Sequence, residues 1–259
     1  DLSKYNYLKS GRNPWQDPYW YRTEVVLPKS YKGKKVWLTL NGINYRADVW
    51  VNGRQVADKK DIVGMFRRFK LDITGYARAG ANNCIAIKIY QVDHPGVPTP
   101  GTQLKVFGPV RGHSYDIFKD ETLKISGGWD CAPVVRDRNM GIYQKVIVEA
   151  TDEVLIENPF VITTLPKSTT MPMKVDTGLA KVNIKLEVRN TSAKLVEGKV
   201  NAWITLLNEV KFPTYTKHME GYLKPIKLTK KVALRAGERK VVELTPEDFP
   251  SLLIENPYR

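Results

Sequence analysis

Residues 47–56 read ADVWVNGRQV, and this stretch decides the class of fold. Two runs suited to β-strands are joined at Asn52–Gly53. Asn-Gly is the strongest short-range hairpin signal, because both residues adopt the positive φ angles that a tight two-residue turn requires. The stretch therefore predicts a β-hairpin.

Strand patterns continue on both sides of this hairpin. Apolar residues alternate with polar ones, so that every second side chain falls on one face, as in a half-buried strand. The clearest runs are 19–27 (YWYRTEVVL), 35–41 (KVWLTLN, with Val36, Leu38 and Leu40 on one face), 83–90 (NCIAIKIY, with Ile85, Ile87 and Ile89 on one face) and 142–149 (IYQKVIVE). No amphipathic helical pattern exceeds about three turns.

The pattern changes character near 150–158 and then resumes. Residues 181–190 alternate cleanly, with Val182, Ile184, Leu186 and Val188 on one face, and further strands are expected within 199–207 and 226–244. Thr245-Pro246-Glu247-Asp248 is typical of a short helical turn, since it combines an N-cap, an early Pro and early acids.

These patterns predict an all-β chain of two β-sandwiches. Residues 1–155 are long enough for a jelly roll of about eight strands. Residues 156–259 have about the size of an immunoglobulin-like sandwich of roughly 100 residues. The second segment has no Cys…Trp…Cys pattern, which excludes an antibody-type domain.

Two loops interrupt the strand pattern of the first domain. Residues 91–115 are rich in Pro and Gly and show no periodicity, and residues 126–141 form a second such stretch. Long irregular insertions in compact domains are usually functional. The second loop places Trp129 beside Asp130. An indole offers a flat apolar face to a sugar ring and a carboxylate accepts hydrogen bonds from its hydroxyls, so this pair is the candidate carbohydrate site.

The charge of the chain is strongly basic. Its 41 Lys and Arg outnumber its 27 Asp and Glu, which gives a net charge of +14. Nucleic acid or an acidic polymer would suit that charge. However, no nucleic-acid motif is present and most Lys alternate with apolar residues along strands, where they protect strand edges. We therefore predict no nucleic-acid partner, and no apolar run is long enough to predict a membrane span.

Other residues receive structural interpretations. The two cysteines, Cys84 and Cys131, lack metal-binding spacing, and Cys84 is expected to be a buried thiol; a bridge between them is not favoured. The three histidines (94, 113 and 218) are far apart in sequence, so we predict no metal and no cofactor. Trp20 and Trp50 are expected to pack in the sheet or core, and Arg22 to form an ion pair.

Five short motifs occur in an order that resembles the N-terminal half of a family 2 glycoside hydrolase, in its β-mannosidase and exo-β-glucosaminidase branch. They are Tyr19-Trp20-Tyr21-Arg22-Thr23-Glu24, the hairpin stretch 47–53, FKLDIT at 69–74, Ala79-Gly80-Ala81-Asn82-Asn83, and Gly128-Trp129-Asp130 followed by Gly141-Ile142-Tyr143. Each motif alone is weak, whereas five in the right order are specific.

The resemblance implies an order of domains and the domain that carries the catalytic residues. Such enzymes begin with a galactose-binding-like jelly roll and an immunoglobulin-like sandwich, followed by a catalytic (β/α)₈ barrel that carries two Glu of a retaining mechanism. No barrel pattern is visible in this sequence. We therefore expect no catalytic residue and no hydrolysis by this chain alone, and a second sandwich that lacks its final strands.

The resemblance also assigns a role to the second loop. Trp129 would form an aromatic wall at the rim of the active site, and Asp130 would accept hydrogen bonds from substrate hydroxyls. At Cys131 the sequence departs from the second Trp that is usual in the branch. The implied partners are a β-linked glycan and the chain's own catalytic barrel.

Two other functions stay open beside this one. A stand-alone carbohydrate-binding module with an attached β-sandwich would bind glycan without a barrel, and a structural adhesion-type protein of tandem sandwiches would not bind sugar at all. The leading hypothesis is the non-catalytic N-terminal part of a secreted or periplasmic β-glycosidase.

Overall fold

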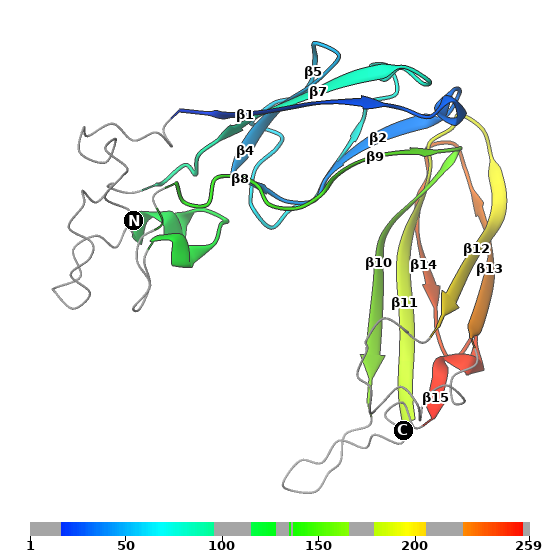
Figure 1. Cartoon of the computed structure of the whole chain (residues 1–259). Coiled ribbons are helices and arrows are strands. Elements are labelled where there is room, and N and C mark those ends of the chain that lie inside the picture. Colours follow the sequence, from blue (N-terminus) through cyan, green and yellow to red (C-terminus); the bar gives the residue numbers. More distant parts are fainter. Residues whose placement is uncertain are drawn as a thin grey trace, which may run out of the picture. The chain divides into compact units, whose positions relative to one another are not determined.

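A computed structural model describes residues 17–95, 115–127, 135, 137–165, 179–205 and 225–255. These residues form strands, turns and short 3₁₀ helices, so the predicted all-β class is confirmed. The chain divides into two compact units, Asp1–Thr151 and Asp152–Arg259. Figure 1 shows the strands of both units.

The first unit contains two main antiparallel sheets (Figure 1). One has the order β1-β7-β4-β5, formed by β1 (Tyr19–Val26), β7 (Asn82–Tyr90), β4 (Arg46–Val51) and β5 (Arg54–Ala57). The other has the order β6-β2-β9, formed by β6 (Phe69–Asp72), β2 (Lys35–Leu40) and β9 (Val146–Thr151). A 3₁₀ helix, η4 (Lys29–Tyr31), lies between β1 and β2 in the sequence.

The hairpin expected at Asn52–Gly53 joins β4 to β5. Asn52 has a φ of 51° and Gly53 a φ of 79°, the left-handed values that this turn requires. The Asn52 side chain also accepts a hydrogen bond from the Cys84 backbone N–H at 2.9 Å, which ties the turn to β7. The hairpin is thus confirmed, and its Asn has a second role in the sheet.

The core of the first unit lies between its two sheets. One cluster of buried side chains contains Ile85, Ile87 and Ile89 from β7 together with Val36, Leu38 and Leu40 from β2. These are the faces that the alternation predicts. Burial of such side chains contributes about 1.5–3 kcal/mol each, which makes this cluster the main stabilising element of the unit.

A smaller layer extends the first unit beyond the sandwich. The strands β3 (Ile43–Asn44) and β8 (Gly141–Ile142) pair with each other, and two 3₁₀ helices, η5 (Tyr115–Lys119) and η6 (Lys124–Gly127), precede β8. A separate buried cluster of Tyr45, Val92 and Ile117 holds this layer to the end of β7.

The second unit is also a two-layer arrangement. Its strands are β10 (Val154–Thr164), β11 (Leu179–Asn190), β12 (Val196–Ile204), β13 (Ile226–Leu234), β14 (Arg239–Leu244) and β15 (Leu253–Glu255), with η7 (Pro250–Leu252) before the last. β11 pairs with β10, β14 and β15, while β12 pairs with β13. The predicted apolar face of β11 packs with residues of β13 and β14 in one core.

Several single-residue expectations can be compared with the structure. Arg22 forms the predicted ion pair, to Glu24 at 2.5 Å. The Phe249 N–H donates to the Thr245 carbonyl at 2.9 Å, which confirms the helical turn. Cys84 is a free thiol of intermediate burial, and Cys131 lies outside the described residues.

Trp20 packs on the sheet and not in the core, and 59% of it is exposed. It lies opposite Lys88, whose side chain is on the face of β7 that points away from the buried isoleucines. Its ring contacts that of Trp50, which is partly buried on β4.

Candidate functional site

The predicted sugar-binding residues, Trp129 and Asp130, lie outside the described residues. The structure does describe the chain on both sides of them. The Val135 backbone N–H donates to the Ser126 carbonyl at 2.9 Å. The segment that carries Trp129 and Asp130 therefore begins and ends at neighbouring points.

Arg138 anchors this segment from inside the protein. It is only 1% exposed, and its guanidinium donates from Nε to the Pro95 carbonyl at 2.8 Å and from Nη1 to the Val135 carbonyl at 2.5 Å. Pro95 belongs to the first loop that the sequence singles out and Val135 to the second. One buried cation thus ties the bases of both loops together.

Asn44 supports the same chain segment from β3. It is fully buried, and its Nδ2 donates to the carbonyls of Arg138 at 2.8 Å and Asn139 at 2.9 Å. Its Oδ1 accepts a hydrogen bond from Thr122 Oγ1 at 2.8 Å. Buried amides are stable only when their polar atoms are partnered in this way.

Asn139 completes the set by donating from Nδ2 to Ser126 Oγ at 2.6 Å. We name Asn44, Thr122, Ser126, Arg138 and Asn139 the loop platform. Four of them, all but Asn139, are buried polar residues. They come from distant parts of the chain, and together they fix the backbone from which the second loop starts and to which it returns.

The platform contains strained backbone. Arg138 has a φ of 52° and Asn139 a φ of 57°, in the left-handed region that residues with a side chain rarely adopt. This conformation costs Arg138 on the order of 1 kcal/mol or more and Asn139 less, because Asn adopts it more readily than most residues. Surrounding contacts impose it on Arg138. Strain of this kind is concentrated at functional sites, which makes the loop platform the candidate functional site of the described chain.

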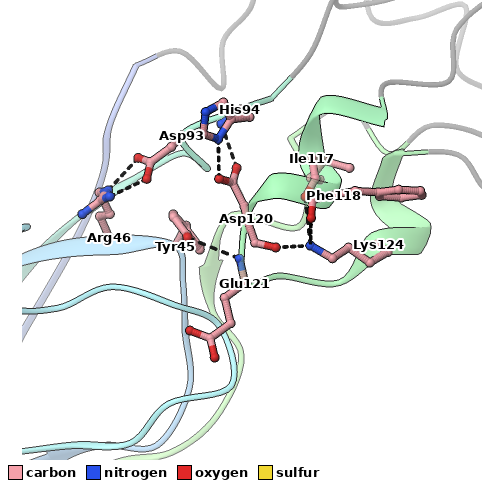
Figure 2. A network of polar contacts seen from close by, with 9 residues as sticks. All are labelled: Tyr45, Arg46, Asp93, His94, Ile117, Phe118, Asp120, Glu121 and Lys124. Carbon is pink, nitrogen blue, oxygen red and sulfur yellow. Dashed lines mark hydrogen bonds and ion pairs between the residues drawn. The ribbon is translucent and has the colours of Figure 1, made fainter.

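A charged network surrounds Asp120 (Figure 2). The buried Asp120 carboxylate accepts a hydrogen bond from the His94 backbone N–H at 2.7 Å, and His94 Nδ1 lies 2.6 Å from its other oxygen. The Lys124 ammonium donates to the carbonyls of Ile117, Phe118 and Asp120. This network docks the segment of η5 and η6 against the end of β7.

Arg46 and Asp93 form a second part of the network (Figure 2). The guanidinium of Arg46 donates to both carboxylate oxygens of Asp93, from Nε at 2.6 Å to the first oxygen and from Nη2 to the second. Both residues line a pocket of about 410 Å³, together with Lys59, Tyr90 and others.

Tyr90 has a perturbed phenol in this pocket. The pKa of Tyr90 is raised to about 12. The largest cause is partial burial; the others are the hydrogen bond that its hydroxyl donates to Asp48 at 2.6 Å and the negative charge of that carboxylate. All of these causes favour the protonated phenol in the folded protein.

The raised pKa of Tyr90 predicts a pH dependence of stability. A group whose pKa is higher in the folded state contributes stability below its unfolded value of about 10, and this contribution is lost as the pH rises from about 10 to 12. In Tyr90→Phe the free energy of unfolding should fall less steeply over that range. Urea unfolding of both proteins at a series of pH values measures the two slopes, with pH 8 as the reference. Equal slopes would contradict the assignment.

The described ranges hold neither a metal-ion cluster nor a membrane-spanning helix. Within them, no cluster of three or more His, Cys, Asp or Glu has the geometry to hold a metal ion. No helix in the same ranges has the length and apolar character needed to cross a membrane.

The residues of the loop platform were not predicted from the sequence. Neither Arg138 nor Asn44 was predicted as a site residue. The available signal was weak: Asn139 follows a charged run, and Asn tolerates positive φ better than most residues. Nothing in the linear sequence shows that Asn44 and Arg138 lie together.

Comparison with known proteins places this site in a family context. Residues 6–144 match the family model described as the glycosyl hydrolase 2 galactose-binding domain-like family. An exo-beta-D-glucosaminidase of Streptomyces avermitilis is 28% identical over 255 residues, which cover 97% of this chain and 22% of that protein. A mannosylglycoprotein endo-beta-mannosidase of Lilium longiflorum is 34% identical over 129 residues, or 49% of this chain and 12% of that protein.

Solved structures show the same relationship. The exo-chitosanase CsxA of Amycolatopsis orientalis superposes with a TM-score of 0.57 and 26% identity, covering 92% of this chain and 22% of that chain. The chain therefore spans about a fifth of the length of these full-length relatives.

Proposed function

The chain belongs to the galactose-binding-like domains of glycosyl hydrolase family 2, and on this basis we propose that it serves a retaining β-glycosidase as its non-catalytic N-terminal part. The match to 97% of this chain but 22% of the Streptomyces relative supports this proposal. In such an enzyme, bond cleavage needs two carboxyl groups about 5–5.5 Å apart, and we assign both to a catalytic barrel. The 259-residue chain by itself is expected to hydrolyse no glycoside.

The contribution of this chain to catalysis would be a substrate-contacting loop. The loop platform supports this proposal. Burial of polar groups such as Arg138 and Asn44 costs free energy, so we expect the loop that they hold to have side chains that must be positioned accurately. A carboxylate and an indole held rigidly at an active-site rim raise the rate by orienting the substrate. We propose that Asp130 binds sugar hydroxyls and that Trp129 packs on the sugar ring.

The proposed partners are a β-linked glycan and the catalytic barrel of the same polypeptide. The named activities of the relatives, which include an exo-beta-D-glucosaminidase and an endo-beta-mannosidase, support a glycan substrate. Polymeric glycans do not cross membranes freely, so we also propose a secreted or periplasmic location. Fractionation of cells that express the natural gene would test the location directly.

The rim role can be tested by kinetics in the full-length protein that contains this chain. Trp129→Ala and Asp130→Ala should each lower kcat/KM by about tenfold, the loss expected for one ring contact or one charge-assisted hydrogen bond. The matched control is Trp203→Ala, which removes a 63% exposed indole from the second unit and should leave kcat/KM unchanged. Unaltered kinetics in both loop variants would refute the assignment of the rim site.

A further inference from the structure

The outer face of the β1-β7-β4 sheet carries side chains that the proposed rim role does not use. The register places Trp20 beside Lys88, Lys88 beside Asp48, and Trp50 beside Ala86. Alternation turns all of these away from the buried core, since Ile85, Ile87 and Ile89 occupy the opposite face of β7. The face is therefore a continuous surface over three strands.

Aromatic rings and cations alternate along this face. The rings of Trp20 and Trp50 lie 5.1 Å apart at an angle of 32°. The Lys88 ammonium stands 5.4 Å from the Trp20 ring and 5.2 Å from the Tyr90 ring, and the Lys59 ammonium lies 4.8 Å from the Tyr90 ring. These cation–π contacts hold flexible lysines in place beside the rings, so that less entropy is lost when a ligand binds.

The pocket described above continues this surface at the start of β4 and the end of β7. Lys59 and Lys60 line it, and neither they nor Lys88 has a carboxylate partner among the ion pairs of the described ranges. Gln91 also lines the pocket, and its side-chain oxygen is buried without a hydrogen-bond donor within the described part of the chain. The pocket wall thus offers Lys59, Lys60 and the unused acceptor of Gln91. Lys88 stands on the adjoining sheet face, opposite Asp48.

The charge of the whole unit has the same sign. Residues 1–151 contain 24 Lys and Arg against 14 Asp and Glu, and so carry most of the net charge of +14. A glycan with free amino groups would be repelled by this surface, whereas one with carboxylates would be attracted.

We propose that this face, defined by Trp20, Trp50, Lys59, Lys60 and Lys88, binds an acidic glycan that contains uronic acid residues. One sugar ring packs its C–H face on the exposed indole of Trp20, and carboxylates of the glycan pair with the lysines. The proposed site uses none of the residues assigned to the rim role and does not depend on the proposed hydrolase role.

A single-stranded nucleic acid is the other polyanion to consider. Proteins that bind single strands stack successive bases on a series of separate aromatic side chains along a basic groove. Here the two indoles contact each other, so they form one stacking platform instead of two. A single platform flanked by cations fits one sugar ring with neighbouring carboxylates better.

Binding of the 259-residue chain to polygalacturonate tests the proposal, with neutral galactan as the uncharged comparison and titration calorimetry at low ionic strength as the readout. We expect polygalacturonate to bind at least tenfold more tightly than galactan, and salt to weaken it. Trp20→Ala should weaken binding about five- to tenfold. The double variant Lys59→Gln/Lys60→Gln, which changes exposed side chains only, should weaken it about tenfold.

Matched controls come from the second unit. Its β12-β13 sheet also exposes a Trp and two lysines that lie opposite each other, Trp203, Lys199 and Lys231. Trp203→Ala and Lys199→Gln/Lys231→Gln should leave affinity unchanged. Trp129→Ala should also have no effect, which separates this site from the rim loop. Thermal unfolding of each variant verifies that it is folded.

Several outcomes would overturn the proposal. Absence of polygalacturonate binding would do so, as would equal losses in the control variants, which would indicate binding by net charge alone. Tighter binding of single-stranded DNA than of polygalacturonate would identify the face as a nucleic-acid site. None of these results bears on the kinetic test of Trp129 and Asp130, so failure of either proposal can be recognised separately.

Discussion

Arg138→Met is expected to lower the free energy of unfolding of the first unit by about 3 kcal/mol. The substitution removes the donors to the Pro95 and Val135 carbonyls, and Met cannot replace them. Burial lowers the pKa of the Arg138 guanidinium, a sign that the site disfavours an uncompensated charge, so part of the loss is offset when that charge is removed. The unsatisfied carbonyls outweigh this gain.

Met is the informative replacement because it has a similar length and cannot relieve the strain at a φ of 52°. The difference in the free energy of unfolding between the two proteins therefore measures the loss of hydrogen bonds and not a change in the backbone. Urea-induced unfolding measures the effect. The control Arg68→Met alters an exposed Arg of the same unit and should change stability by less than about 0.5 kcal/mol.

The same variant should also affect function in the full-length protein. If Arg138 holds the bases of both loops, its loss displaces Trp129 and Asp130 and lowers kcat/KM at least as much as removal of either side chain. A variant that loses less than about 1 kcal/mol of stability and keeps its kinetics would contradict the role of the loop platform.

Asn190→Ala should produce the second large effect, a loss of about 3 kcal/mol in the second unit. Asn190 is fully buried at the end of β11. Its Nδ2 donates to the carbonyls of Lys194 at 2.7 Å, Leu234 at 3.1 Å and Arg235 at 2.9 Å, and its Oδ1 accepts from the Ser192 N–H at 2.9 Å. One amide thus joins the β11–β12 turn to the turn between β13 and β14.

Asn190→Asp distinguishes the donor role of this amide from its acceptor role. It keeps the acceptor for Ser192 but places a carboxylate against three carbonyl oxygens, so it should destabilise at least as much as Ala. Asn201→Ala is the control, because Asn201 is exposed on β12 and its side-chain oxygen accepts a hydrogen bond from Thr229 Oγ1. Urea unfolding of each variant measures the change in stability. Equal stability of the Asn190 and Asn201 variants would show that the hydrogen bonds of the Asn190 side chain do not stabilise the second unit.

Local signals in the sequence predicted most strands. The alternation in 83–90 and 181–190 matches β7 and β11, because a strand that is buried on one face must repeat its apolar residues with a period of two. The 3₁₀ helices at Tyr115–Lys119 and Lys124–Gly127 were missed, since elements of four or five residues leave no periodic pattern.

The exposure of Trp20 could not be predicted from local pattern. Its strand begins with three aromatic residues in a row, so the pattern did not indicate which face is buried. The register with β7 settles this, because Trp20 lies opposite Lys88 on the outer face. The alternative of core packing for Trp20 is therefore wrong, whereas packing on the sheet is confirmed by its contact with Trp50. The outer face that Trp20 forms became visible only in three dimensions.

The sequence by itself determined the all-β class, the hairpin at Asn52–Gly53, the core faces and the family, since each depends on neighbouring residues or on short motifs in order. Only the tertiary structure decided that Asn44, Ser126 and Arg138 form one buried platform and that Trp20, Trp50 and Lys88 share one face. The physical reason is that hydrogen bonds between buried polar groups and contacts across strands join residues separated by tens of positions. Such pairings depend on register and layer packing, which leave no trace in the local order of residues.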